Sequence, residues 1–201
     1  MMDIQDTIRT IKSELRLAMN GVASAYMRES GIRYKLNFGV ELPRLRGIAQ
    51  QFVPDHNLAQ ALWKEDIREC KLLAAMLQPI ETFYPDIADI WTESMPNAEI
   101  AGHTVQNLYC QLPYASQKAY EWIADERDMF QVCGYLILAR LFMQGLHPNE
   151  RSGNEFLDQA RAALHGPAEV RKAATAALQK YRMLGGKEDR QAESILKETE
   201  M

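Results

Sequence analysis

The sequence predicts an all-α fold in which helices stack in pairs, and three observations lead to this prediction. Apolar residues recur at three- and four-residue steps along almost the whole chain, as amphipathic helices require. No segment alternates apolar and polar residues for long enough to predict a strand. Trp63, Trp91 and Trp122 lie close to 30 residues apart, each late in the first helix of a predicted pair. A repeat of this length is typical of helical solenoids.

Length and composition predict one globular domain over residues 1–201. Apolar residues make up 47% of the chain and charged residues 25%, which excludes disordered and collagen-like proteins. The net charge of -4 argues against a strongly basic nucleic-acid binder. A binding surface depends on where charges cluster rather than on their sum, so nucleic acid stays a candidate partner.

The N-terminal stretch MMDIQDTIRT lacks the positive and apolar regions of a signal peptide, so we expect a cytoplasmic protein. The most apolar run, residues 133–143, is interrupted by Arg140 and is shorter than the roughly 20 residues that span a bilayer, so no membrane segment is predicted. Cys70, Cys110 and Cys133 show no CxxC spacing. They are predicted to be buried free thiols in a reducing compartment.

The first predicted helix spans residues 3–19, because its apolar residues share one face. That face consists of Ile4, Ile8, Ile11 and Leu15. Asp3 is available as its N-cap. A second helical run, residues 21–30, either continues the first helix or bends away from it at Asn20-Gly21. Gly31 is predicted to end this run in the left-handed conformation.

Another helix is predicted to begin near Leu42, with Pro43 in its first turn, where a missing N–H is harmless. The residues before it, Phe38-Gly39-Val40, are predicted to form a short apolar hook. Arg44 and Arg46 follow at the helix start, which favours anions over cations. Their placement suggests that they interact with something outside the helix.

Four helical pairs are predicted in the rest of the chain. Their ranges are 58–64 with 66–77, 87–93 with 97–112, 116–124 with 128–144, and 154–164 with 168–183. The tryptophans are predicted to fill the interfaces between neighbouring repeats. The second helix of the third pair is apolar on almost all sides, so we expect it near the centre of the stack. Residues 187–201 are predicted to be a polar terminal helix or a frayed tail.

Two motifs carry a resemblance to a known family. The first is Tyr26-Met27 followed by Phe38-Gly39-Val40, Pro43 and Arg46; the second is Leu62-Trp63, Arg68-Glu69 and Leu73-Ala74-Ala75. Together they resemble the AlkD-type DNA alkylation-repair glycosylases, and the likeness extends from about Ala23 to about Tyr181. The resemblance implies a stack of HEAT-like repeats with a concave DNA-binding face.

The resemblance also implies a catalytic site, and the chain departs from it. The family uses a Trp and an Asp one turn apart, an Arg on the next repeat and a later Trp. On this sequence they fall on Ala98, Gly102, Val132 and Ala176, so all four are absent. Glu99 is a candidate replacement carboxylate, and His103 shares its helix face one turn on. The simpler alternative is a surface carboxylate beside an ordinary helical histidine.

Six cations are candidates for phosphate contacts in a common groove. They are Arg44, Arg46, Arg68, Lys71, Arg171 and Lys172. The alternative is a solvated or salt-bridged helix face, and Arg68 beside Glu69 could form an ion pair between repeats. No metal site and no cofactor is predicted, because HExxH, paired Cys/His spacings and glycine-rich phosphate loops are absent.

The leading hypothesis is a non-catalytic member of this family that binds nucleic acid or a partner on its concave face. The first alternative is an active glycosylase that uses Glu99 in a divergent pocket. The second is a protein-interaction scaffold, a common use of stacked helical pairs. Candidate partners are therefore duplex DNA and protein, and the sequence makes no prediction of oligomeric state.

Overall fold

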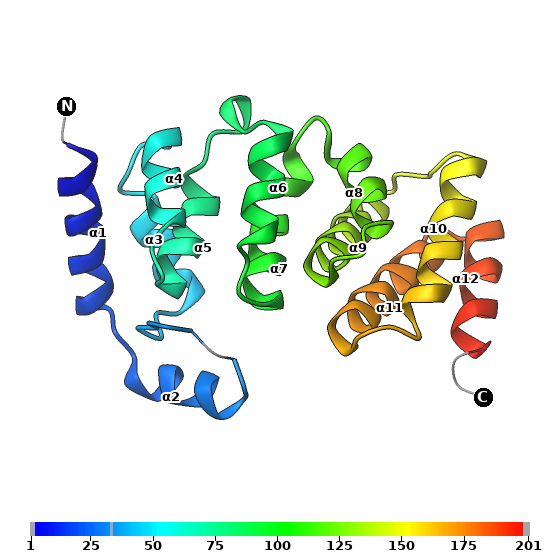
Figure 1. Ribbon diagram of the computed structural model, residues 1–201, viewed down its shortest axis with the longest axis horizontal. Helices are drawn as coiled ribbons and strands as arrows, with labels where there is room; N and C mark the ends of the chain where they lie inside the picture. Colours follow the sequence, from blue (N-terminus) through cyan, green and yellow to red (C-terminus); the bar gives the residue numbers. More distant parts are fainter. Residues whose placement is uncertain (1–2, 33, 199–201) are drawn as a thin grey trace. The chain divides into compact units, whose positions relative to one another are not determined.

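The computed structural model describes residues 3–32 and 34–198, and their regular elements are all helical (Figure 1). They are α1 (Ile4–Leu17), α2 (Gly21–Glu29), α3 (Leu42–Ala49), α4 (His56–Trp63), α5 (Arg68–Leu77), η1 (Ile80–Thr82), α6 (Pro85–Glu93), α7 (Ala98–Asn107), η2 (Tyr109–Gln111), α8 (Ala115–Ile123), α9 (Asp128–Met143), α10 (Glu150–Ala163), α11 (Ala168–Arg182) and α12 (Gly186–Glu198). The all-α prediction is confirmed. The chain divides into two compact units, Met1–Trp91 and Thr92–Met201. The expectation of a single domain stays a prediction.

The first unit is built around α5. Nine of the ten residues of this helix are buried, and it packs against α3 and α4. Helix α1 packs on α4 through its predicted apolar face, whose residues Ile8, Ile11 and Leu15 are buried. Asp55 caps α4, since its carboxylate accepts a hydrogen bond from the Leu58 N–H at 2.8 Å. This core holds α3, the helix that carries Arg44 and Arg46.

The chain bends sharply between α1 and α2. Helix α1 ends at Leu17 and α2 begins at Gly21, so the predicted alternative of a bend at Asn20-Gly21 is confirmed. The Asn20 side chain accepts a hydrogen bond from the Ala23 N–H at 3.1 Å and so caps α2. Asp3 stands at the N-cap of α1, as predicted, but makes no side-chain capping bond there. Gly31 follows α2 with φ of 82°, the predicted left-handed conformation.

The apolar hook is buried and is held by the second family motif. The Glu69 carboxylate accepts hydrogen bonds from the N–H groups of Phe38 and Val40, both at 3.2 Å. Arg68 donates to the Val40 carbonyl oxygen and to Glu69, both at 3.1 Å. The two motifs, which lie about 30 residues apart in sequence, therefore form one buried polar junction. Their spacing is explained by this contact.

The tryptophans of the first unit form a stacked pair. The ring centroids of Trp63 and Trp91 are 4.0 Å apart with nearly parallel planes, and Phe83 meets Trp91 edge-on at 4.9 Å. Trp91 also donates its indole N–H to the Gln60 side chain at 3.0 Å. Both tryptophans are buried, so the prediction that they are core residues is confirmed.

The second unit is built around α9, which packs against α7, α8 and α11. Ten of its 16 residues are buried, as expected for a helix that is apolar on almost all sides, and its central place in the whole stack stays a prediction. Helix α8 crosses so closely that a Cβ on Gly134 would lie 2.8 Å from the Ala119 carbonyl oxygen. Only glycine fits there. Trp122 is buried between Tyr109 and Phe130, with ring centroids at 5.4 and 5.7 Å, as predicted for a core tryptophan.

Two predicted boundaries in this unit are wrong. The helix expected over residues 97–112 ends at Asn107, because Leu108 leaves the helical conformation and Tyr109 begins the short η2. That break turns Tyr109 into the core beside Trp122. Helix α10 begins at Glu150 rather than near 154, since the Asn149 side chain caps it by accepting from the Ser152 N–H at 2.9 Å.

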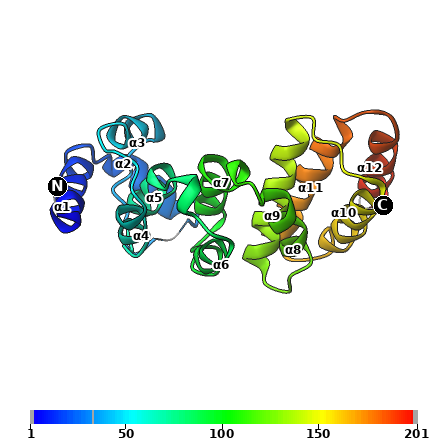
Figure 2. The same ribbon diagram turned by 90° about the horizontal axis from the view of Figure 1, so that it is seen from above.

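The polar C-terminal segment is a helix, α12, which lies beside α10 and α11 (Figure 2). It buries only Ala192 and Ile195. Ion pairs add to its contacts. They join Arg161 to Glu198 at 3.0 Å, Lys187 to Glu150 at 3.4 Å and Arg182 to Asp189 at 2.9 Å, and the His147 ring lies 3.5 Å from the Glu188 carboxylate.

The cysteines are free thiols, of which Cys70 and Cys133 are buried and Cys110 is half-buried. Burial raises the pKa of Cys70 and of Cys133 to about 12, so both stay protonated at neutral pH. None of the described helices is long and apolar enough to cross a membrane.

Candidate nucleic-acid interface

The structure divides the six candidate cations into buried and exposed groups. Arg68 is 3% exposed and Lys71 is 9% exposed, so neither is available to a phosphate backbone. The Lys71 ammonium donates to the Trp63 carbonyl oxygen at 2.7 Å. The same ammonium lies 4.8 Å from the centroid of the Trp63 ring. Burial lowers the pKa of Lys71. The prediction that Arg68 and Lys71 contact phosphates is therefore wrong, and both are structural residues.

Arg68 forms an ion pair, as the alternative at this position proposed, but the pair lies within α5 rather than between repeats. Its partner is Glu69, which is fully buried, and the pair ties α5 to the hook. A buried pair of this kind has its remaining donors and acceptors satisfied by backbone groups, as its desolvation requires.

Arg44 and Arg46 are exposed at the start of α3. A loose contact of 3.8 Å joins the Arg44 guanidinium to the Glu14 carboxylate, and both side chains are partly solvated. Arg46 forms no ion pair with any residue that the structure describes. The neighbouring motif residue Tyr26 is 70% exposed, whereas Met27 is half-buried and accepts a hydrogen bond from Asn37. The sequence motif does not reveal which of these two residues is exposed.

One face of α11 lines an open hollow of about 520 Å³. Its lining residues are Ala168, Arg171, Lys172, Thr175, Ala176 and Gln179. Arg171 and Lys172 are exposed, and neither is ion-paired within the described part of the chain. They lie near the N-terminal end of the helix, where the dipole favours an anion and disfavours cations. This face is suited to a phosphate.

The positions matched to the family's catalytic residues have different surroundings. Ala176 lies in the hollow on α11, and Ala98 and Gly102 are half-exposed on α7. Val132 is 2% exposed, so it faces the core of the second unit. An arginine that grips a phosphate must reach solvent, and the inward orientation of Val132 argues against its match to such an arginine.

Glu99 and His103 lie one turn apart on α7, and both are half-exposed. Their helix begins at Asn97, whose side chain accepts a hydrogen bond from the Ile100 N–H at 3.1 Å. Gly102 stands beside them without a side chain. Glu99 is the one carboxylate on α7, the helix that carries Gly102 at the position of the family's Asp.

The charge along the chain separates the exposed cations into two groups. Residues 72–117 contain no lysine or arginine and carry five carboxylates. These are Glu81, Asp86, Asp89, Glu93 and Glu99. A phosphate backbone would be repelled by this stretch and attracted by the segments on either side of it.

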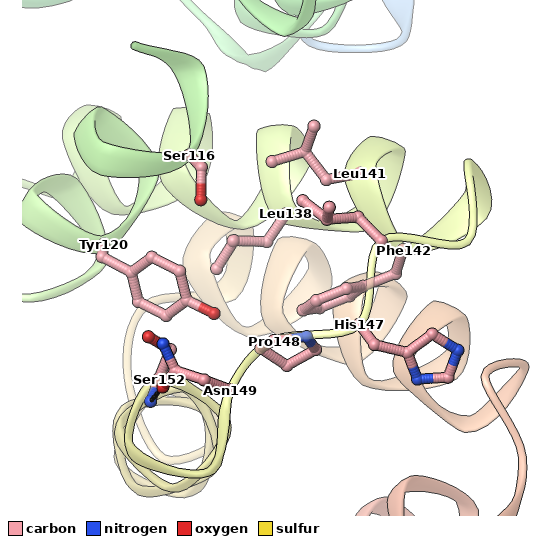
Figure 3. A pocket seen from close by; sticks show the side chains of 10 residues that line it. Ser116, Tyr120, Leu138, Leu141, Phe142, His147, Pro148, Asn149 and Ser152 are labelled. Atoms are coloured by element: carbon pink, nitrogen blue, oxygen red, sulfur yellow. Dashed lines mark hydrogen bonds between the residues drawn. The ribbon is translucent and has the colours of Figure 1, made fainter.

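A second cavity, of about 200 Å³, lies among α8, α9 and α10 (Figure 3). Figure 3 shows Leu138 and Phe142 as its apolar wall and the Tyr120 hydroxyl directed into the space between Leu138 and Pro148. Burial raises the pKa of Tyr120 to about 12, so this hydroxyl is neutral. No carboxylate lines the cavity, so it lacks the group that would stabilise a positive sugar during base excision. The described residues hold no cluster of three or more metal-ligating side chains.

Comparison with known proteins identifies a family and a fold. The family model described as DNA alkylation repair enzyme matches residues 11–193. One similar solved structure is of a protein from a new family related to the HEAT-like repeat DNA glycosylases with affinity for branched DNA structures. It superposes with a TM-score of 0.85 at 17% identity, covering 98% of this chain and 83% of that chain. No curated protein matches the sequence.

Proposed function

This chain belongs to the DNA alkylation repair enzyme family, and from that premise we propose that it binds duplex DNA through the phosphate backbone without excising bases. The observation that carries the proposal is the hollow on α11, where Arg171 and Lys172 stand exposed and have no ion-pair partner among the described residues. Arg44 and Arg46 supply a second group of phosphate contacts from α3. Each unit contributes its own group of cations to the proposed binding, and we propose a cytoplasmic location for the protein.

Phosphate contacts position a duplex but do not identify its sequence. The hollow offers the Gln179 side-chain amide as a further donor suited to phosphate oxygens, whereas the Thr175 hydroxyl already donates to the Arg171 carbonyl oxygen at 2.8 Å. We therefore expect weak binding that ignores sequence and falls steeply with salt, because counterion release drives it. The affinity of the structural neighbour for branched DNA is in keeping with a DNA-binding role.

Reversing both charges of the hollow tests the interface. Arg171→Glu with Lys172→Glu should lower the affinity for duplex DNA on the order of ten- to a hundredfold at low salt. The slope of log affinity against log salt should fall by roughly 2, since each lost phosphate contact removes about 0.9. Fluorescence anisotropy with a labelled duplex across a salt series measures both quantities.

The matched control is Arg151→Glu with Arg190→Glu. These residues are exposed on α10 and α12, away from the hollow, and the substitution changes net charge by the same amount. If both double variants weakened DNA binding equally, the loss would reflect the change in net charge and not contacts at the hollow. Binding that ignores salt, or no binding at low salt, would favour the protein-interaction scaffold.

The second test concerns catalysis. A duplex carrying 7-methylguanine should release no base above the spontaneous rate when incubated with the protein. The groups that the family uses are replaced at Ala98, Gly102 and Ala176, and loss of one preorganised electrostatic group typically lowers a rate on the order of a hundred- to a thousandfold. Chromatography of the released base measures the rate. Release that Glu99→Gln abolishes would instead establish the divergent glycosylase.

A further inference from the structure

The cavity among α8, α9 and α10 takes no part in the proposed DNA binding. Its volume is about 200 Å³, and the residues that line it all belong to the second unit. They differ from the residues that line the hollow on α11. The cavity is therefore a separate candidate site, and its lining indicates what it can hold.

One wall of the cavity is apolar. Leu138 and Phe142 lie one turn apart on α9 and are 1% and 3% exposed. Figure 3 shows both side chains at the edge of the same space. A ligand that places an apolar or aromatic part against this wall removes that part from water, which favours binding.

The opposite side carries hydrogen-bonding groups that are still available. The hydroxyls of Ser116, Tyr120 and Ser152 form no hydrogen bond with any residue that the structure describes. Asn149 uses its side-chain oxygen to cap α10, so its amide nitrogen is left as a donor. Because burial raises the pKa of Tyr120 to about 12, its hydroxyl donates as well as accepts at neutral pH. These groups are all uncharged.

The lining also offers no free charge to a ligand. None of the described residues that line the cavity is a lysine, an arginine, an aspartate or a glutamate. The His147 ring lies 3.5 Å from the Glu188 carboxylate, so a proton on it is already balanced by that group. A charged ligand would lose its hydration without gaining a partner of opposite charge. The lining is therefore suited to an uncharged ligand.

The mouth of the cavity is shaped by the turn that follows α9. Gly145 has φ of 79°, and the Leu146 N–H donates to the Leu141 carbonyl oxygen at 3.0 Å, which ends the helix. Pro148 and the Asn149 cap then fix the entry into α10. A site that is formed in advance loses little conformational entropy on binding.

We propose that this cavity binds a small uncharged aromatic amide with a single ring. A cavity of about 150 Å³ with an apolar lining holds benzene, so about 200 Å³ has room for one ring with a small substituent. The ring lies against Leu138 and Phe142. The amide oxygen accepts from the Tyr120 hydroxyl, and the amide N–H donates to a serine hydroxyl oxygen.

Benzamide is the probe that tests the site. Titrated into the full chain, it should shift the amide resonances of the residues that line the cavity, with a Kd of about 1 mM, as expected for a ligand of this size. Benzoate has the same shape with a negative charge and should bind on the order of tenfold more weakly, because no cation offsets its desolvation. Nuclear magnetic resonance of the isotope-labelled protein measures both affinities.

Two variants locate the binding. Tyr120→Phe removes the hydroxyl and keeps the ring, so it should weaken benzamide about three- to tenfold, the effect of one neutral hydrogen bond. Ser152→Leu places a larger apolar side chain at the cavity and should reduce binding further. The control is Tyr84→Phe, which removes the hydroxyl of a tyrosine in the first unit that is 64% exposed and should change nothing. The amide spectrum shows whether each variant is folded.

The outcomes are distinct from those of the DNA experiments. If no cavity resonance shifts at the solubility limit of benzamide, the cavity holds only water and the proposal is wrong. Equal affinity for benzoate would contradict selection of an uncharged ligand. Unchanged affinity in both cavity variants would place benzamide elsewhere and overturn the assignment. Tyr120→Phe should bind duplex DNA as the parent does, so failure of this proposal leaves DNA binding intact.

Discussion

Glu69→Ala is expected to destabilise the protein by about 3 to 5 kcal/mol, the usual loss when one partner of a buried ion pair is removed. Its carboxylate is fully buried and accepts hydrogen bonds from Arg68 and from the N–H groups of Phe38 and Val40. Without it, a buried guanidinium and two buried N–H groups lose their acceptor. Urea unfolding followed by circular dichroism measures the change.

Two further variants compare the stability contributed by the buried Arg68–Glu69 pair with that of an exposed ion pair. Asp66→Ala removes the carboxylate of the exposed Lys35–Asp66 pair and should leave the unfolding midpoint almost unchanged, because exposed pairs contribute little. Arg68→Met with Glu69→Gln removes both buried charges at once. Its stability should recover only in part, since a glutamine has a single carbonyl oxygen for the two hook N–H groups. If this double variant were as stable as the parent, the Glu69 carboxylate would not be the group that holds the hook.

Trp91→Ala is the other substitution with a large expected effect. Trp91 is 1% exposed, stacks on Trp63 and meets Phe83 edge-on, so its loss leaves a cavity that the neighbouring rings cannot fill. Truncation of a buried tryptophan typically lowers the free energy of unfolding by about 3 to 5 kcal/mol. Differential scanning calorimetry should show a clearly lower melting temperature.

The neighbouring Ile90→Ala provides the control. Ile90 lies on the same helix but is 62% exposed, so its truncation should have a small effect. A Trp91→Ala protein that melts like the parent would contradict the role of the stacked rings in the first unit.

Local patterns in the sequence predicted most helices because each pattern has a local cause. The apolar face of α1, the proline at the start of α3 and Gly31 after α2 all act within a few residues. The family motifs correctly indicated a helical-repeat fold, as the likeness to the solved structure with a TM-score of 0.85 shows. The spacing of the tryptophans likewise predicted their burial, since a residue that recurs once per repeat occupies the same place in each.

Burial of charged residues could not be predicted in this way. Arg68 and Lys71 carry charges that normally lie at the surface, and only the three-dimensional position of the hook and of Trp63 turns them inward. The same applies to Gly39, whose necessity depends on the distant Asn20 carbonyl. Conversely, the exposure of Leu17 and Val22 follows from the angle at which α2 leaves α1, and no apolar periodicity encodes that angle.

Helix α12 covers part of α10 and α11, and it buries Ala192 and Ile195. Ion pairs such as Arg161–Glu198 and Lys187–Glu150 add to this contact. Because salt screens exposed ion pairs, we expect α12 to be held less firmly as ionic strength rises. The residues of α10 and α11 that it covers would then be exposed, and exposed apolar surface favours self-association.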